Sequence, residues 1–213
     1  MVKSNNKLMA LIVLLLFLSL AQAAEPDSQS SSSMIEYHGF HINTFQLSED
    51  QRATVLPSIL KQLDIVESVG LPVDVLRFLR GVPLAVDASM RGNPGQYTNQ
   101  AGSWLVAIRP MVFPENKPIL LHELLHAYHF KVLTLNNQEI LDAYQKAKQS
   151  DMYPSNFQSS HFLENAKEYF AITGTVYLFG AIQQPPFNCD VLSRSEPEYV
   201  AFMTKTFGTH TCH

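Results

Sequence analysis

Cysteine is scarce in this chain. The 213 residues include two, Cys189 and Cys212, both near the C-terminus. This pair lacks the C-x-x-C spacing of structural zinc sites, which argues against a zinc-finger or zinc-ribbon protein. If the chain is exported, a disulfide that ties down the C-terminal tail is the simplest account of the pair. A Cys/His metal site that includes His210 or His213 is the alternative.

Charge is also limited, and it is not concentrated. Charged residues make up 16% of the sequence, the formal net charge is −4 at pH 7, and no run of Lys and Arg occurs. A basic patch is the usual footprint of a nucleic-acid-binding protein, so nucleic acid is not an expected partner. No internal repeat is present either, which excludes repeat architectures.

The longest apolar run, Leu8–Leu20, lies at the N-terminus and is short for a membrane span, which needs about 20 residues. Lys3 and Lys7 precede this run, and Ala21–Ala23 follows it as an A-x-A site. This order predicts a secretory signal peptide over residues 1–23, cleaved after Ala23, and hence a secreted or periplasmic protein without stable membrane insertion. An uncleaved anchor is the alternative. No cysteine follows the run directly, so a lipid anchor is not indicated.

The remaining chain has ordinary globular composition, since 46% of all residues are hydrophobic. Residues 24–33 are Ser-rich and predict a flexible spacer, and residues 34–213 predict a single α+β domain. The turn residues at 87–102 predict a long loop. Apolar periodicity predicts strands at 35–42, 82–86 and 103–108, and helices at 57–69, 72–79, 117–133, 136–148, 160–178 and from 195 onward.

The stretch Ile119–Tyr128 contains the pattern H-E-x-x-H, formed by His122, Glu123 and His126. Residues four apart on a helix lie on one face, one turn apart, so the two imidazoles can hold one metal ion. Glu123 then lies within reach of a water on that ion. This arrangement is typical of a zinc-dependent hydrolase, with two histidine ligands and a carboxylate base.

The surroundings of this motif favour a metal site over a chance match. Four apolar residues make the helix strongly hydrophobic: Leu120, Leu121, Leu124 and Leu125. The alternative is that the histidines face solvent, or that they are buried in the core with hydrogen-bond partners from the protein. Buried imidazoles need partners, because unpaired buried polar groups are costly, and a metal ion satisfies the two histidines of the motif. His129, on the same face, is expected to be a supporting or structural histidine and not a ligand.

A catalytic zinc ion has three protein ligands and one water, so the third ligand must come from another element. The predicted helix at 160–178 carries His161, Glu164 and Glu168 at spacings of three and four residues, on one face. Glu168 is followed directly by Tyr169-Phe170-Ala171, which indicates a buried turn. Either carboxylate is a candidate ligand. The alternative is a solvated Glu/Lys face without a metal.

Two stretches resemble gluzincin metallopeptidases of the anthrax lethal factor and Pro-Pro endopeptidase type. They are His122–Ala127, which reads HELLHA, and Asn165–Ala171, which reads NAKEYFA. The match covers about residues 100–180, and the N-terminal third matches only in the order of its elements. The resemblance implies a zincin-like fold, with a small mixed sheet followed by helices that carry the two motifs.

The resemblance also implies roles for single residues. Glu123 would be the general base, and the strand at 103–108 would be the edge strand along which a peptide substrate lies. One catalytic Zn²⁺ ion would be held by His122, His126 and Glu168, with Glu168 ahead of Glu164 as the third ligand.

The sequence departs from that family at one position. In the family a tyrosine that steadies the oxyanion often lies seven residues before the third ligand, and here that residue is His161. His161 could donate a hydrogen bond to an oxyanion in its place. Tyr153, in the preceding polar loop, is the other candidate.

The sequence therefore predicts a secreted zinc metalloendopeptidase that hydrolyses protein or peptide substrates. One alternative is a catalytically weak or inactive binding module on a zincin scaffold, favoured by the missing tyrosine. The intact Glu123 argues against it, since an inactive protein has no chemical need of a base. Another alternative is a zinc amidase that acts on cell-wall material. Neither the cleavage specificity nor the oligomeric state follows from the sequence.

Overall fold

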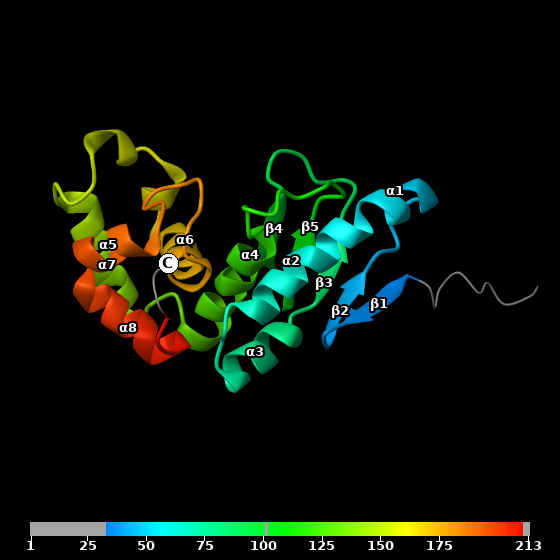
Figure 1. Ribbon diagram of the computed structural model, residues 1–213, viewed down its shortest axis with the longest axis horizontal. Helices are drawn as coiled ribbons and strands as arrows, with labels where there is room; N and C mark the ends of the chain where they lie inside the picture. Colours follow the sequence, from blue (N-terminus) through cyan, green and yellow to red (C-terminus); the bar gives the residue numbers. More distant parts are fainter. Residues whose placement is uncertain (1–32, 101, 211–213) are drawn as a thin grey trace, which may run out of the picture.

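A five-stranded mixed sheet, with strand order β1-β2-β3-β5-β4, forms one end of the molecule (Figure 1). The outer pairs β1–β2 and β4–β5 are antiparallel, and β3 is parallel to both of its neighbours. The strands are β1 (Met34–Tyr37), β2 (Phe40–Asn43), β3 (Leu84–Val86), β4 (Gly95–Gln100) and β5 (Ser103–Ile108).

Helices α1 to α3 pack with this sheet, and α5, α7 and α8 form the opposite end of the molecule, with α4 and α6 between the two ends (Figure 1). The helices are α1 (Glu49–Thr54), α2 (Leu56–Ser68), α3 (Val73–Arg80), α4 (Ile119–Tyr128), α5 (Gln138–Gln149), α6 (Ala166–Phe179), α7 (Cys189–Ser195) and α8 (Pro197–Phe207). The structure also contains a short π-helix, η1 (His129–Leu133), and two 3₁₀ helices, η2 (Ser155–Phe157) and η3 (His161–Leu163).

The computed structural model describes residues 33–100 and 102–210. The predicted signal peptide (1–23), nearly all of the predicted spacer (24–33) and Cys212 lie outside the described residues. Export, signal cleavage and the Cys189–Cys212 disulfide therefore stay predictions.

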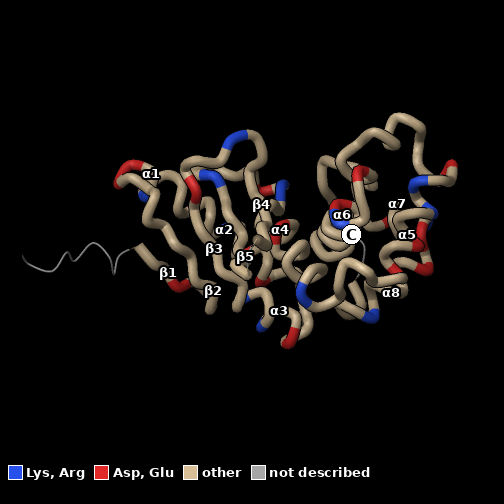
Figure 2. Tube along the Cα trace, turned by 180° about the vertical axis from the view of Figure 1, so that it is seen from behind, with Lys and Arg blue, Asp and Glu red and all other residues tan. Residues whose placement is uncertain are grey.

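The α+β class and the mixed sheet agree with the sequence-based expectation, whereas the zincin-like assignment remains a proposal. Within the described residues, none of the helices combines the length and apolar character that crossing a membrane requires. Along the described part of the chain, positions of acidic and basic residues are interspersed (Figure 2).

Local sequence explains the first elements. Ser48 and Gln51 form a capping box at the start of α1. The strand predicted at 35–42 is instead two strands, because His38 and Gly39 have φ values of 52° and 79° and close a tight hairpin turn. Positive φ at both central residues is the requirement of a type I′ turn, which explains the glycine at position 39.

The prediction of a loop over 87–102 is wrong for its last part, which contains β4. β4 pairs with β5 as far as Gln100 and Ser103, and Gly102, just before β5, has a φ of +82°, which glycine adopts readily. The strand at 103–108 is therefore not the edge strand, since β3 pairs on one side of it and β4 on the other. The edge strand on this side of the sheet is β4, and its polar sequence GQYTNQ shows no apolar periodicity by which it could have been predicted.

The long helix predicted at 160–178 is also divided. Asn165 has an extended backbone (φ −158°, ψ 168°), and its side chain accepts hydrogen bonds from the backbone N–H groups of Lys167 and Glu168. This cap starts α6 afresh, so His161 lies in η3, before the helix that carries Glu168. The single helix face proposed for His161, Glu164 and Glu168 does not exist.

Helix α4 is the central element of the core. It contacts α2, α3, β4 and β5 as well as α6, so its apolar side chains are covered from both ends of the molecule. Leu125 is fully buried, and one of its methyl groups lies 3.1 Å from the position that a Cβ on Gly174 of α6 would take. The close approach of α4 and α6 brings the two motif-bearing helices together.

Replacing Leu125 by alanine is expected to lower the free energy of unfolding by about 2–5 kcal/mol, because it leaves a cavity between α4 and α6. Leu135→Ala is the matched control: Leu135 is 37% exposed, and we expect a change of about 0.5 kcal/mol. Urea unfolding followed by circular dichroism measures both. Equal losses in the two variants would contradict this packing of α4.

Candidate metal centre

Two imidazoles on α4 converge at the cleft between the sheet and α6. His122 and His126 lie one helical turn apart, and their Nε2 atoms are 3.1 Å from each other. Most other residues of α4 are buried apolar side chains, so the packing of the helix directs these two histidines toward the cleft. The spacing of the H-E-x-x-H pattern thus has the structural consequence expected of it.

Glu168 reaches the same point from α6. It lies in the first turn of the helix that Asn165 caps, and its Oε2 atom is 3.4 Å from His122 Nε2 and 3.3 Å from His126 Nε2. Burial would raise the pKa of Glu168, but the two imidazoles outweigh burial and hold the pKa of this carboxyl well below its usual range. The carboxyl is therefore ionised, as a metal ligand must be.

His122, His126 and Glu168 form a group that could hold a metal ion. The distances between their ligand atoms, 3.1, 3.3 and 3.4 Å, are close to one another. Tetrahedral zinc with ligands at about 2.0–2.1 Å separates neighbouring ligand atoms by about 3.3–3.4 Å. Glu168 Oε2 is buried and makes no well-directed hydrogen bond despite these contacts. A cation between the three atoms would satisfy it.

His161 stands beside this group and not within it. Its Nε2 atom is 3.0 Å from Glu168 Oε2, and its Nδ1 atom is 2.7 Å from Glu164 Oε2. The side chain of Glu164 is 61% exposed, compared with 17% for that of Glu168. The structure therefore brings Glu168 to the two histidines of α4, whereas Glu164 pairs with His161 on the outer side.

Glu123 lies on the wall of the cleft next to this group. Its carboxyl is buried, and the backbone N–H of Tyr97 on β4 donates a hydrogen bond of 2.8 Å to its Oε2 atom. Burial raises the pKa of Glu123, although the adjacent His122 and this backbone hydrogen bond oppose the shift. A carboxyl with a raised pKa is suited to accept and return a proton.

The approach of β4 to Glu123 is very close. A Cβ atom on Gly95 would lie 2.7 Å from Glu123 Cγ and 3.0 Å from its Oε1 atom. Only glycine fits at this position of the strand. From the sequence, Gly95 was interpreted only as one of the turn residues of the predicted 87–102 loop, and Tyr97 was not predicted to lie at the site. A glycine inside a polar strand is the pattern that could have marked a close backbone approach.

His129 is buried behind the site, at 1% exposure, against the ring of Phe170 at 4.7 Å between ring centroids. Neither of its ring nitrogens has a hydrogen-bond partner among the described residues. Burial, together with His126 and Lys167, lowers its pKa to about 4, so the imidazole is neutral at pH 7. His129 is not part of the metal-competent group.

Tyr153 is not brought to the cleft, so the structure does not support it as an oxyanion donor. It is buried at 3% exposure, and its hydroxyl donates a hydrogen bond to Glu196. Tyr169 donates to the other oxygen of the same carboxylate. Tyr153 thus belongs to a buried cluster with Glu196 and Tyr169 in the C-terminal helical part. The sequence pattern did not predict this cluster.

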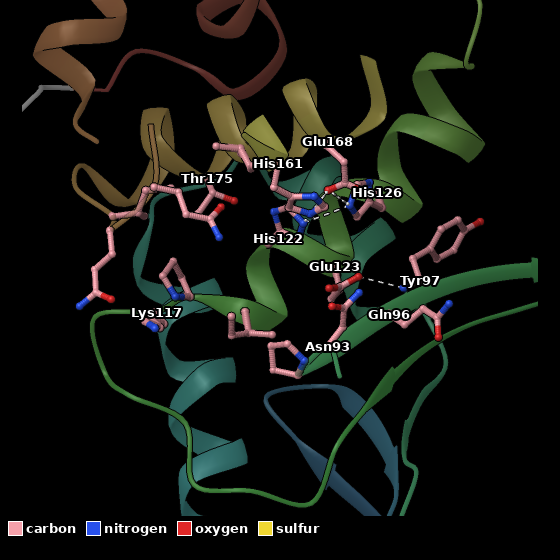
Figure 3. Close-up of a pocket in the computed structure, with 18 of the residues that line it drawn as sticks. Asn93, Gln96, Tyr97, Lys117, His122, Glu123, His126, His161, Glu168 and Thr175 are labelled. Carbon is pink, nitrogen blue, oxygen red and sulfur yellow. Dashed lines mark hydrogen bonds and ion pairs between the residues drawn. The ribbon is translucent and has the colours of Figure 1, made fainter. Parts of the chain in front are cut away.

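The cleft around the metal-competent group has a volume of about 660 Å³. Figure 3 shows His122, His126, Glu168 and His161 gathered at one point, with Glu123 beside them and linked to Tyr97 on β4. The rest of the lining mixes polar and apolar residues, and most of it was not predicted. These additional residues include Asn93, Gln96, Asn116, Lys117, Lys167, Thr175, Gln183 and Gln184.

Comparisons with known proteins give limited information. No protein-family model matches the chain, and no curated protein matches its sequence. Among solved structures, the Pro-Pro endopeptidase PPEP-2 from Paenibacillus alvei is similar with a TM-score of 0.45 and 18% sequence identity, over 77% of this chain and 95% of that chain. A similarity this remote establishes neither a common fold nor a common activity, so a functional proposal depends on the site itself.

The choice of third ligand can be tested by metal content. We expect Glu168→Ala to lower zinc affinity by about 100-fold or more, because it removes a ligand and leaves two imidazoles. Glu164→Ala is the matched control and is expected to keep one zinc ion per chain. Competition with a zinc chelator, followed by elemental analysis, measures both. Retention by Glu168→Ala together with loss by Glu164→Ala would reverse the assignment.

Proposed function

We propose that this protein is a secreted zinc-dependent metallopeptidase. The observation that carries the proposal is the convergence of three ligand atoms from two helices, 3.1–3.4 Å apart, beside a buried carboxyl in an open cleft. A structural zinc site is closed by four protein ligands, whereas a three-ligand group in a cleft leaves a position for water. The predicted N-terminal signal peptide supports secretion.

In this proposal the three ligands are His122, His126 and Glu168. A zinc ion held there would supply Lewis-acid polarisation of the scissile carbonyl and an activated water. Glu123 accepts the proton of the attacking water and delivers it to the leaving amine. In the free protein, the hydrogen bond from the Tyr97 N–H keeps the carboxyl of Glu123 on the cleft wall.

In this proposal, His161 donates the hydrogen bond that stabilises the oxyanion. It lines the cleft, and its Nε2 atom faces Glu168, next to where the reacting carbonyl would lie. The contact of Nδ1 with Glu164 fixes the orientation of the ring. Tyr153 has no role in this proposal.

The substrate in this proposal is an extended peptide. β4 is the edge strand, and residues at its start line the cleft. An exposed strand edge holds an extended chain through backbone hydrogen bonds. Amide side chains in the lining, such as Gln96 and Gln184, add hydrogen-bonding groups, and a polar cell-wall peptide is the second substrate class to include in a cleavage screen.

Substitution of Glu123 by glutamine tests the mechanism. We expect kcat to fall by about 10²- to 10⁴-fold in a peptide-library cleavage assay, because glutamine cannot accept the proton of the attacking water. Zinc content should be unchanged, since Glu123 is not a ligand. Full activity in Glu123→Gln would contradict the mechanism, and absence of both zinc affinity and cleavage in the unaltered protein would leave the inactive binding module as the better account.

Substitution of His161 tests the oxyanion donor. His161→Phe is expected to lower kcat by roughly 100-fold, with KM and zinc content little changed, because the lost hydrogen bond forms as charge develops on the carbonyl oxygen. Steady-state kinetics on one cleaved peptide separates kcat from KM. A matched control is His38→Phe, a histidine outside the cleft, which should leave both constants unchanged. Unaltered kcat in His161→Phe would remove His161 from the mechanism.

A further inference from the structure

The direction of the backbone groups along β4 follows from its pairing with β5. Arg109 N–H donates to Pro94 C=O at 2.9 Å just before the strand, so Pro94 faces β5. In an antiparallel ladder the N–H and C=O of one residue point to the same side, and the side alternates along the strand. Gly95, Tyr97 and Asn99 therefore direct their backbone groups away from β5, toward the free edge of the sheet.

One of these outward groups is already engaged. The N–H of Tyr97 donates to Glu123 Oε2 at 2.8 Å, and Figure 3 marks this bond across the cleft wall. Gly95, two residues earlier, leaves the space that the side chain of Glu123 fills. The carboxyl of the proposed general base thus lies directly against the edge to which a peptide strand would add.

The carboxyl of Glu123 and a carbonyl of a bound peptide strand would consequently compete for the same donor, the N–H of Tyr97. A peptide that pairs with β4 as a new strand presents its carbonyl oxygens to the outward N–H groups, and the N–H of Tyr97 lies beside the reaction centre. A backbone N–H has a single hydrogen, and the carboxyl of Glu123 already accepts it at 2.8 Å. Strand pairing at Tyr97 has to displace that bond or share it.

We propose that the Tyr97 amide is a substrate-sensitive positioning group. Without substrate it holds Glu123 against β4, and with substrate it turns to a carbonyl of the bound peptide and releases the carboxylate toward the attacking water. The inference rests on the proposed peptidase function. It adds that binding of the peptide backbone and release of the base are one coupled event.

Binding to inactive variants tests the coupling without turnover. The probe is the best-cleaved peptide of the library screen, titrated by calorimetry into zinc-loaded Glu123→Ala and Glu123→Gln. Both substitutions remove the charge, but glutamine keeps a side-chain acceptor for the Tyr97 N–H and alanine does not. We expect the peptide to bind Glu123→Ala about fivefold more tightly, the effect of one neutral hydrogen bond that no longer competes.

The donor is tested in the same cycle. Tyr97→Pro removes the N–H, and proline is tolerated where an edge N–H faces outward. Tyr97→Ala is the matched control, since it loses the same side chain and keeps the N–H. The fivefold difference should vanish in the Tyr97→Pro background and persist in the Tyr97→Ala background. Equal affinities of the two Glu123 variants, or a difference that survives in Tyr97→Pro, would overturn the inference.

Hydrogen exchange provides a second measurement if Tyr97→Pro does not fold. The amide of Tyr97 should exchange faster in Glu123→Ala than in Glu123→Gln, and bound peptide should slow it in both variants. Exchange that is independent of Glu123 would overturn the inference while leaving the peptidase proposal intact. If the unaltered zinc-loaded protein cleaves no peptide, the proposed function fails, and the inference fails with it at that earlier step.

Discussion

The packing of α4 is the constraint on which the rest of the site depends. Its leucines are buried between the sheet and α6, and this fixes the rotation of the helix about its axis. Once the rotation is fixed, His122 and His126 have one direction available, toward the cleft. The same packing sets the distance to α6, where Gly174 allows Leu125 to approach closely. A metal-binding geometry therefore follows from an apolar core, and the polar residues need little positioning of their own.

The position of Glu168 in the metal-competent group depends on a different feature, the cap at Asn165. A continuous helix from residue 160 would carry His161, Glu164 and Glu168 along one face and leave the two carboxylates equivalent. The cap restarts the helix three residues before Glu168, so that Glu168 enters the first turn while Glu164 stays outside with His161. Carboxylates are favoured in the first turn, where the helix dipole is positive. The break in the helix thus separates Glu168, which joins the metal-competent group, from Glu164, which pairs with His161.

These features explain which parts the sequence could predict. The H-E-x-x-H spacing encodes geometry within one helix, so His122, Glu123 and His126 came together as expected. The position of Glu168 was proposed from resemblance, and the structure brings it to the histidines. β4 was missed because an edge strand beside a cleft needs no alternating apolar face, and Tyr153 was wrongly considered because sequence proximity to His161 does not report burial. Geometry within one helix or strand could be predicted from the sequence, whereas contacts between helices and strands could not.

The contact between β4 and Glu123 resolves two physical problems at once. An edge strand has unpaired N–H groups, and a buried carboxylate needs donors, since either group left unsatisfied in a poorly hydrated site is costly. In the free protein, the N–H of Tyr97 on β4 donates a hydrogen bond to the carboxyl of Glu123, so both groups have a partner. In the proposed peptidase, a change at Glu123 therefore alters the edge of the sheet as well as the proposed base, and a fall in kcat/KM for such a variant would combine a binding effect with a chemical one. Separating the two requires the affinity of an uncleaved peptide alongside the rate, because a gain in affinity would mask part of the loss in chemistry.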